Sequence, residues 1–371
     1  MLNKLNDWRT VMPGSNIDSN MIIETSIGED DVCFYDVRKD PFDIYGFYNP
    51  KEESFFKRMP DEIAKNINKG ISFSYLFTTG GRVRFSTDSQ YVAIYAEIPF
   101  SERISHMPLS STAGFDLYID DEKSNTSRFY KPFLPPYDFK DSYESKIKFQ
   151  SRKKRYFTIN FPTYSTVKNF YIGIQKDAEI NEGIKYRGNL PIVFYGSSIT
   201  NGACSSRPGN TYPNIISRRT GLDHINLGFG GSCKAEDTIV DYMSTLPMCA
   251  FVSEYDHNAP DVDYLRETHY KMYRKIRDTH KDIPYIMVSK VDFETSYKKN
   301  ILRRDVIYES YMRAIQDGDQ NVYFVDGSRV FRGYYKEMCT VDGTHPTDLG
   351  FAMMADAIGD EIVRALTQSN F

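Results

Sequence analysis

Four short segments of the sequence carry side chains that could act together in nucleophilic chemistry. Two adjacent serines, Ser197 and Ser198, follow the apolar run PIVFY, and Asn258 follows the run CAFVSEY. Further along the chain, Asp342 stands three residues before His345 in VDGTHPTDLG. A serine hydroxyl is a weak nucleophile unless a base lies within hydrogen-bonding distance, and a histidine held by a carboxylate suits that role. These residue types therefore indicate acyl transfer through a serine.

The segment around His345 also has a purely structural interpretation. Thr344, His345 and Pro346 followed by Asp348 are typical of a turn that caps the last helix, and Asp342 would then be a turn residue only. The other histidine that follows a strand is His257; the remaining four lie in the first half, before a strand or on a helix (His106, His224, His269 and His280). Both interpretations remain open on these residues alone.

Candidate donors for the negative charge of an oxyanion lie in two further loops. Gly230 and Gly231 follow the run HINLGF and offer unobstructed backbone N–H groups, while Asn258 offers a side-chain amide. Glycine pairs are common in turns and asparagine is common in loops, so neither feature is informative alone. Their coincidence with Ser198 and His345 is much less expected by chance.

The elements that would position these residues alternate between strand and helix beyond residue 188. The expected strands cover 191–195, 224–229, 249–255, 285–290 and 322–327, and the expected helices cover 212–220, 236–246, 263–280, 302–316 and 348–366. Such alternation implies right-handed crossovers and a parallel sheet. Ligands of open α/β sheets bind beyond the carboxyl ends of the strands, which is where the candidate serines, glycines, asparagine and histidine stand.

The first half of the chain has a different rhythm. From about residue 70 to 176 it reads as short strands separated by Pro, Asp, Asn and Ser clusters, which is typical of a sandwich or jelly roll. A short helix is expected over 58–70, and a hairpin turning at Gly80 and Gly81. The polar stretch 176–189 marks the boundary. We therefore predict an all-β domain over 1–187 and an α/β domain over 188–371.

Composition excludes several classes of protein. The net charge of −4 gives no basic surface for nucleic acid, and no apolar run is long enough for a membrane span. The N-terminal residues 1–15 show no apolar signal-peptide core, and the five cysteines have neither disulfide nor zinc spacing. We expect a cytoplasmic chain without metal or cofactor. Exposed strands of the β-domain would allow a homo-oligomer.

Together, these segments resemble the four-block pattern of the SGNH (GDSL) hydrolase superfamily, whose members are flavodoxin-like α/β esterases, lipases and acyltransferases. The resembling blocks are Gly196-Ser197-Ser198-Ile199-Thr200, Gly231, Asn258 and Asp342-Gly343-Thr344-His345-Pro346. By position, the resemblance makes Ser198 the nucleophile, His345 the base and Asp342 the residue that orients it. The Ser198 N–H, Gly231 and Asn258 would form the oxyanion hole.

A second resemblance lies in the first half. The stretch AGFDLYID (113–120) is similar to the GxDLY segment of an N-terminal β-domain that precedes some SGNH esterases. The chain also departs from the family, since Ser197 replaces the usual Asp and Ala259-Pro260 stand where many members have Asp. The position in the block favours Ser198 over Ser197 as the nucleophile. The G-x-S-x-G elbow of the competing α/β-hydrolase fold is absent.

The loop after the serines bears on the substrate. NGACSSRPGN (201–210) is polar and contains Arg207, which could contact substrate or form a structural ion pair. A polar approach without an apolar lid favours short acyl groups on hydrophilic alcohols. The prediction is a serine esterase that removes a short acyl group, acetyl foremost, from a sugar or glycoside. An O-acyltransferase with the same serine chemistry and a glycan-binding module without chemistry are the alternatives.

Overall fold

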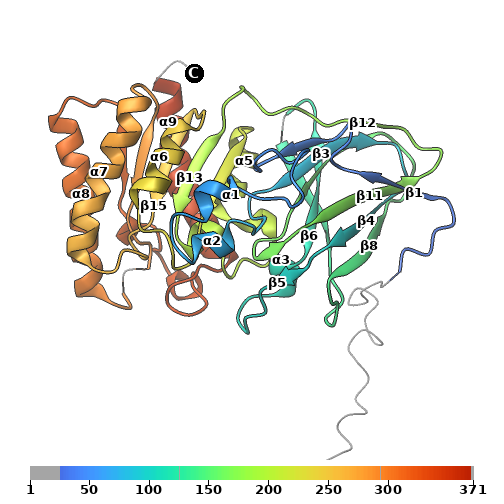
Figure 1. Cartoon of the computed structure of the whole chain (residues 1–371), viewed down its shortest axis with the longest axis horizontal. Helices are drawn as coiled ribbons and strands as arrows, with labels where there is room; N and C mark the ends of the chain where they lie inside the picture. The colour runs from blue at the N-terminus through green and yellow to red at the C-terminus, as the bar shows by residue number, and fades with distance from the viewer. Residues whose placement is uncertain (1–25, 125, 293, 369–371) are drawn as a thin grey trace, which may run out of the picture.

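The computed structural model describes residues 26–124, 126–292 and 294–368, and the N-terminal stretch interpreted above as lacking a signal peptide lies outside them. Figure 1 shows two halves side by side, an antiparallel β-rich half and an α/β half built on a parallel sheet. Within the described residues, no helix is long and apolar enough to cross a bilayer.

The α/β half is built on one five-stranded parallel sheet. Its strands, in the order β14-β13-β15-β16-β17, are β13 (Ile192–Gly196), β14 (His224–Gly228), β15 (Ala250–Glu254), β16 (Tyr285–Val288) and β17 (Val322–Val325). This is the flavodoxin-like order, in which the chain reverses direction across the sheet between β13 and β15. The predicted α/β fold is confirmed, and the ends of β13 and β15 mark the place where a ligand is expected.

Helices cover both faces of the parallel sheet. One apolar core joins the sheet to α6 (Asp237–Thr245), α7 (Val262–Thr279) and α8 (Tyr297–Gln316). A second core on the other face joins it to α5 (Tyr212–Thr220) and α9 (Asp348–Gln368). Strands buried on both faces are apolar throughout, which explains why runs such as IVFY do not alternate.

The first half packs two antiparallel sheets around a third core. The sheet orders are β1-β11-β4-β8 and β12-β3-β9-β6-β7, with β2 pairing β3 and a separate pair of β5 and β10. The bounds are β1 (Val32–Asp36), β2 (Asp43–Tyr45), β3 (Arg82–Thr87), β4 (Tyr91–Glu97), β5 (Phe100–Ser101), β6 (Phe115–Asp121), β7 (Thr126–Phe133), β8 (Ser142–Lys148), β9 (Arg155–Asn160), β10 (Ser165–Thr166), β11 (Asn169–Gln175) and β12 (Ile180–Glu182). Inward side chains of both sheets form one cluster rich in phenylalanine and isoleucine. The predicted β-rich half is confirmed.

The segment before β3 differs from the sequence-based expectation. Instead of one helix over 58–70 and a strand before Gly80, it forms the single turns α1 (Asp61–Ala64) and α2 (Ile71–Ser74). The expected hairpin does not form: the first of its two strands is absent, and β3, which follows Gly80 and Gly81, pairs instead with β2, β9 and β12. Tertiary packing decides here, because apolar side chains of this segment enter the core of the other half.

Residues 59–75 cross from the β-rich half to the α/β half. Met59, Ala64, Ile71 and Tyr75 are buried in the same cluster as the residues of β13, β14 and α6. Figure 1 shows α1 and α2 in front of the junction, beside the α/β half. The domain boundary between residues 187 and 188 therefore stays a prediction. A segment of the first half packs into the core of the second, so the two halves are not separate in their packing.

Candidate active site

Ser198 stands at the first turn after the strand β13. The preceding Ser197 caps the short helix α4 (Ser198–Asn201): its Oγ accepts from the N–H of Ile199 at 3.1 Å and donates to Glu254 Oε2 at 2.9 Å. Ser197 is fully buried and its hydroxyl is engaged on both sides. This leaves Ser198 as the serine whose hydroxyl faces a cavity.

Gly196 makes this tight turn possible. A Cβ at this position would lie 2.1 Å from Thr200 Oγ1 and 2.4 Å from the carbonyl oxygen of Glu254. Both neighbours belong to the same network, because Thr200 Oγ1 also donates to Glu254 Oε2 at 2.9 Å. A side chain at residue 196 would therefore push the serine loop away from β15.

Ser198, His345 and Asp342 lie in a continuous hydrogen-bonded chain. Ser198 Oγ is 2.8 Å from His345 Nε2, and His345 Nδ1 is 2.7 Å from Asp342 Oδ2. The backbone N–H of His345 donates to Asp342 Oδ1 at 2.8 Å. Burial opposes ionisation of Asp342, but the backbone and side-chain hydrogen bonds from His345 outweigh it and lower the pKa of this carboxyl to about 2. The carboxylate is thus charged at neutral pH and accepts from Nδ1–H, which leaves Nε2 free to accept the serine proton.

The oxyanion candidates surround the same cavity. Gly231, at φ +68°, and Asn258 both line it together with Ser198 and His345. Asn258 Oδ1 accepts from the N–H of Cys233 at 3.2 Å, which orients the amide and leaves its two N–H donors for another partner. The structure therefore brings together all four segments that the sequence singled out.

The cavity has a volume of about 620 Å³, and both halves of the chain line it. The β-rich half contributes Ile104, His106, Met107 and Tyr164. His106 Nε2 lies 3.5 Å from Asp342 Oδ2, and its ring centroid is 6.2 Å from that of His345. His106 was expected to lie in the β-rich half without a role. The residues around it form no recognisable motif, and its partners Asp342 and His345 follow more than two hundred residues later.

A second carboxylate and histidine group lies behind the serine loop. Glu254, Asp256 and His257 are at the end of β15, with His257 Nε2 at 3.3 Å from Glu254 Oε1 and 3.8 Å from Asp256 Oδ1. His257 Nε2 makes no hydrogen bond to a described residue. Burial raises the pKa of Glu254 to about 8 and that of Asp256 to about 6, and it lowers the pKa of His257 well below its usual value. The sequence drew attention to His257 but not to Glu254.

Arg207 does not line the cavity. Its guanidinium stacks on the ring of Phe129 at 3.8 Å, and its Nε lies 3.5 Å from the buried carboxylate of Asp116. Of the two roles that the sequence left open for Arg207, these contacts suit the structural ion pair.

Two groups of described side chains have metal-ligand chemistry within 4.8 Å: His106 with Cys204 and His345, and Glu254 with Asp256 and His257. Neither fits a resident ion well. In the first group, burial raises the pKa of Cys204 to about 12, and His345 is already bonded at both nitrogens. In the second, Glu254 holds its proton at neutral pH. Metal ligands must instead be deprotonated.

Two family models match the chain. Residues 189–363 match the GDSL-like lipase/acylhydrolase family, and residues 32–180 match the N-terminal domain of SGNH-type esterases that is called GxDLY. No curated protein matches the sequence.

Several solved structures share the whole architecture. A protein assigned as a GDSL-like lipase from Bacteroides ovatus has a TM-score of 0.81 at 23% identity, covering 91% of this chain and 98% of that one. A salicylyl acyltransferase from a tetracycline biosynthetic pathway has a TM-score of 0.73 at 18% identity over the same shares. An acetyl xylan esterase from the rumen bacterium Butyrivibrio proteoclasticus has a TM-score of 0.59 at 12% identity, covering 91% and 99%. At these identities the likeness shows a shared fold.

Proposed function

Because the chain belongs to the SGNH/GDSL hydrolases and carries their GxDLY-type N-terminal domain, we propose that it is a serine esterase that removes short acyl groups, acetyl foremost, from a carbohydrate or glycoside. The family makes the chain a carboxylic ester hydrolase. The observation that carries the proposed serine mechanism is the chain of hydrogen bonds from Ser198 through His345 to Asp342, beside an open cavity.

In the proposed reaction, Ser198 Oγ attacks the carbonyl carbon of the ester while its proton moves to His345 Nε2. The carbonyl oxygen becomes an oxyanion that accepts hydrogen bonds from the Ser198 and Gly231 N–H groups and the Asn258 amide. The bond to the alcohol oxygen then breaks, and His345 donates its proton to the departing alcohol. Water, deprotonated by His345, hydrolyses the acyl-enzyme and restores Ser198.

The residues that line the cavity support the choice of substrate. Ile104 and Met107 offer apolar surface for a small acyl group. Lys290 and Lys299 also line the cavity, with no carboxylate among the described lining residues, whereas the Arg303 guanidinium is buried and donates to backbone carbonyls. A hydrophilic alcohol fits this polar lining better than a lipid chain, and an acidic sugar fits best.

Acyl transfer is the second candidate. It uses the same first step, but an acceptor alcohol takes the place of water in the second. The structural likeness to a salicylyl acyltransferase is compatible with this reaction. A cavity open enough to admit an alcohol acceptor is compatible with both reactions. We propose hydrolysis first because acyl transfer additionally requires that water be outcompeted.

The remaining proposals concern surroundings and assembly. We propose a reducing, cytoplasmic location, in keeping with five cysteines that are all free thiols. Assembly into a homo-oligomer is also a proposal, and size-exclusion chromatography with light scattering would test it.

The first experiment compares p-nitrophenyl acetate, butyrate and octanoate as substrates of the wild type and of Ser198→Ala. Activity that is highest on acetate, falls with chain length and vanishes in the variant supports a short-chain serine esterase. Ser197→Ala is the matched control, since it removes the neighbouring hydroxyl and should retain Ser198-dependent chemistry at a reduced level. An inactive wild type on all three esters would move the acyltransferase to first place, and adding alcohol acceptors with an acyl donor would then decide.

A further inference from the structure

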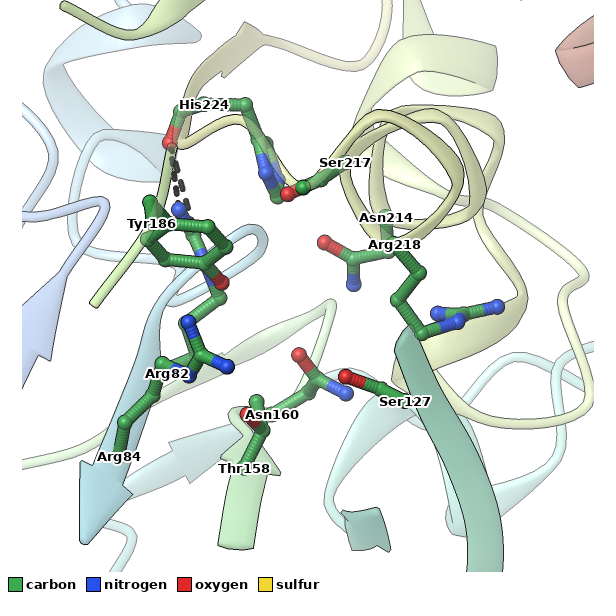
Figure 2. Close-up of a pocket in the computed structure, with 11 residues that line it drawn as sticks. Arg82, Arg84, Ser127, Thr158, Asn160, Tyr186, Asn214, Ser217, Arg218 and His224 are labelled. Atoms are coloured by element: carbon green, nitrogen blue, oxygen red, sulfur yellow. Dashed lines mark hydrogen bonds between the residues drawn. The ribbon is translucent and has the colours of Figure 1, made fainter. Parts of the chain in front are cut away.

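A second cavity lies between the two halves of the chain, away from Ser198. Arg82 and Arg84 of β3, Ser127 of β7, and Thr158 and Asn160 of β9 line one side, and Asn214, Ser217 and Arg218 of α5 with His224 of β14 line the other. Tyr186, from the connection between the halves, closes it. Figure 2 shows the Arg84 guanidinium and the Asn160 and Asn214 amides pointing into this space, whereas the Arg218 guanidinium points away.

Several polar atoms around this cavity are buried without a hydrogen-bond partner. Arg84 uses Nε and Nη2 to bond Asp120 Oδ2 at 3.3 and 3.0 Å, and its Nη1 has no partner. Both ring nitrogens of His224 and the Oδ1 of Asn214 are also unpartnered. The three side chains are at most 3% exposed. A buried guanidinium N–H without an acceptor is costly, so this arrangement calls for a bound species.

The charge balance around the cavity favours a negative species. Three arginines line the cavity, Arg82, Arg84 and Arg218, and no carboxylate is among its described lining residues. The partners of Arg82 and Arg84, Asp223 and Asp120, lie outside that lining. Burial and the charges of Arg82 and Arg218 lower the pKa of His224 well below its usual value, as expected in a cationic setting.

The size of the cavity limits the ligand. Its free volume is about 20 Å³. A single water needs at least about 10–15 Å³ measured in this way, so there is room for one or two waters or one monatomic ion, but not for a phosphate or a sugar.

We propose that this cavity binds one monatomic anion of chloride size, held by Arg84 Nη1 and a ring N–H of His224. The ion accepts hydrogen bonds inside a lining that holds arginines and no carboxylate, and it links β3 of the first half to β14 of the second. Asn214 Oδ1 is an acceptor and would not contact the anion directly. A single water that donates to Asn214 and accepts from Arg84 is the alternative, and the following experiments decide between them.

The direct test is a crystal of the full chain soaked in sodium bromide. An anomalous peak within hydrogen-bonding distance of Arg84 Nη1 is the expected result. Electron density for water at that position, with no anomalous signal, would overturn the proposal.

The solution test is thermal unfolding in sodium chloride against sodium gluconate at equal ionic strength. Chloride should raise the melting temperature in a saturable manner by about 2–4 °C over gluconate, because a ligand that binds only the folded state stabilises it by mass action. His224→Leu removes one ligand and breaks no hydrogen bond of the side chain, and it should reduce the chloride effect. Arg84→Met should abolish it.

The matched control is Arg152→Met, which removes an arginine of the same half from a surface ion pair with Asp88 and Asp177. This variant should retain the full chloride effect. Equal melting temperatures in chloride and gluconate for the wild type would contradict the proposal, whatever the variants do.

Discussion

Two groups of the same residue types lie on either side of the serine loop, and they behave in opposite ways. In the outer pair, Asp342 and His345, the carboxyl pKa falls to about 2. In the buried cluster, Glu254, Asp256 and His257, the carboxyl pKa values rise to about 8 and 6. Asp342 keeps about a third of its side-chain surface exposed, whereas Glu254 and Asp256 keep 1%. Burial, more than residue identity, separates a carboxylate that orients a base from a carboxyl that holds a loop.

The division of labour follows from the contacts of each group. The outer pair contacts the hydroxyl of Ser198, so it is placed for proton transfer. The buried cluster contacts the loops instead: Asp256 Oδ2 accepts from the backbone N–H of Lys290 at 3.0 Å, and Glu254 Oε2 accepts from the hydroxyls of Ser197 and Thr200. It therefore holds the loops that carry Ser198 and Asn258, and a protonated Glu254 can do this without a counter-charge.

The largest expected effect separates the two histidines. His345→Gln should lower kcat on p-nitrophenyl acetate by at least about 10⁴-fold, because no other group accepts the serine proton. His257→Gln should lower it by less than about 10-fold, because the side chain is neutral and does not contact Ser198. Steady-state kinetics on both variants, with circular dichroism to confirm folding, measures the difference. Equal losses in the two variants would end the distinction between outer pair and buried cluster.

The next effect concerns the donor that the buried cluster holds in place. Asn258→Ala should lower kcat by about 10²- to 10³-fold, with a small change in KM, because an oxyanion donor acts mainly in the transition state. Asn258→Asp keeps the shape and the acceptor for the Cys233 N–H but removes the donor. It should be impaired as strongly, and an active Asn258→Asp enzyme would reject the oxyanion role.

An effect at least as large is expected at the carboxylate of the outer pair. Asp342→Asn should lower kcat by about 10³- to 10⁴-fold, since the backbone N–H groups of Thr344 and His345 hold the oxygen at the Oδ1 position and the amide NH2 would then face His345 Nδ1, which selects the wrong imidazole tautomer. Above pH 4 the wild-type pH–rate profile should show no ionisation of Asp342, because its pKa lies near 2. An unchanged kcat in this variant would remove Asp342 from the mechanism.

The smallest effect on turnover, with a distinct effect on stability, is expected at Glu254. Between pH 4.5 and about 8 the folded chain holds a proton on Glu254 that the unfolded chain has released, so stability falls as the pH rises through this window. Glu254→Gln cannot ionise and should flatten this fall by up to about 1.4 kcal/mol per pH unit. Urea unfolding of both proteins at pH 5, 6, 7 and 8 measures it, and parallel curves would show that Glu254 is ionised when folded.

The regular alternation of apolar strand segments and helices made the α/β half predictable from the sequence. The helix ending at Gly221 was expected because glycine adopts the left-handed conformation seen there, at φ +69°. The α8 helix begins at Tyr297, earlier than the expected residue 302, because that first turn lies on the surface and carries no periodic signal. In the first half, α2 was mistaken for a strand, since ISFSYLF is rich in β-formers and only its contacts with the other half make it helical.

The site residues that belong to the four motif blocks could be predicted from the sequence. Ser198, Gly231, Asn258, Asp342 and His345 were named from the sequence and lie around one cavity, while their roles stay a prediction. His106 and Tyr164 were missed because they approach from the β-rich half through tertiary packing. Glu254 was missed because a carboxyl at the end of a strand carries no sign that it will be buried beneath a serine.

The passage of residues 59–75 into the α/β core limits how this protein can be recombined. Met59, Ala64, Ile71 and Tyr75 fill the core of a half whose strands are synthesised more than a hundred residues later. A fragment starting at residue 188 would lack these four side chains and expose the apolar surface of β14 and α6 that they cover. A chimaera with a foreign β-domain would fold only if residues 59–75 were kept with the α/β half. Because this stretch lies between β2 and β3 of the first half, the two halves cannot be exchanged separately.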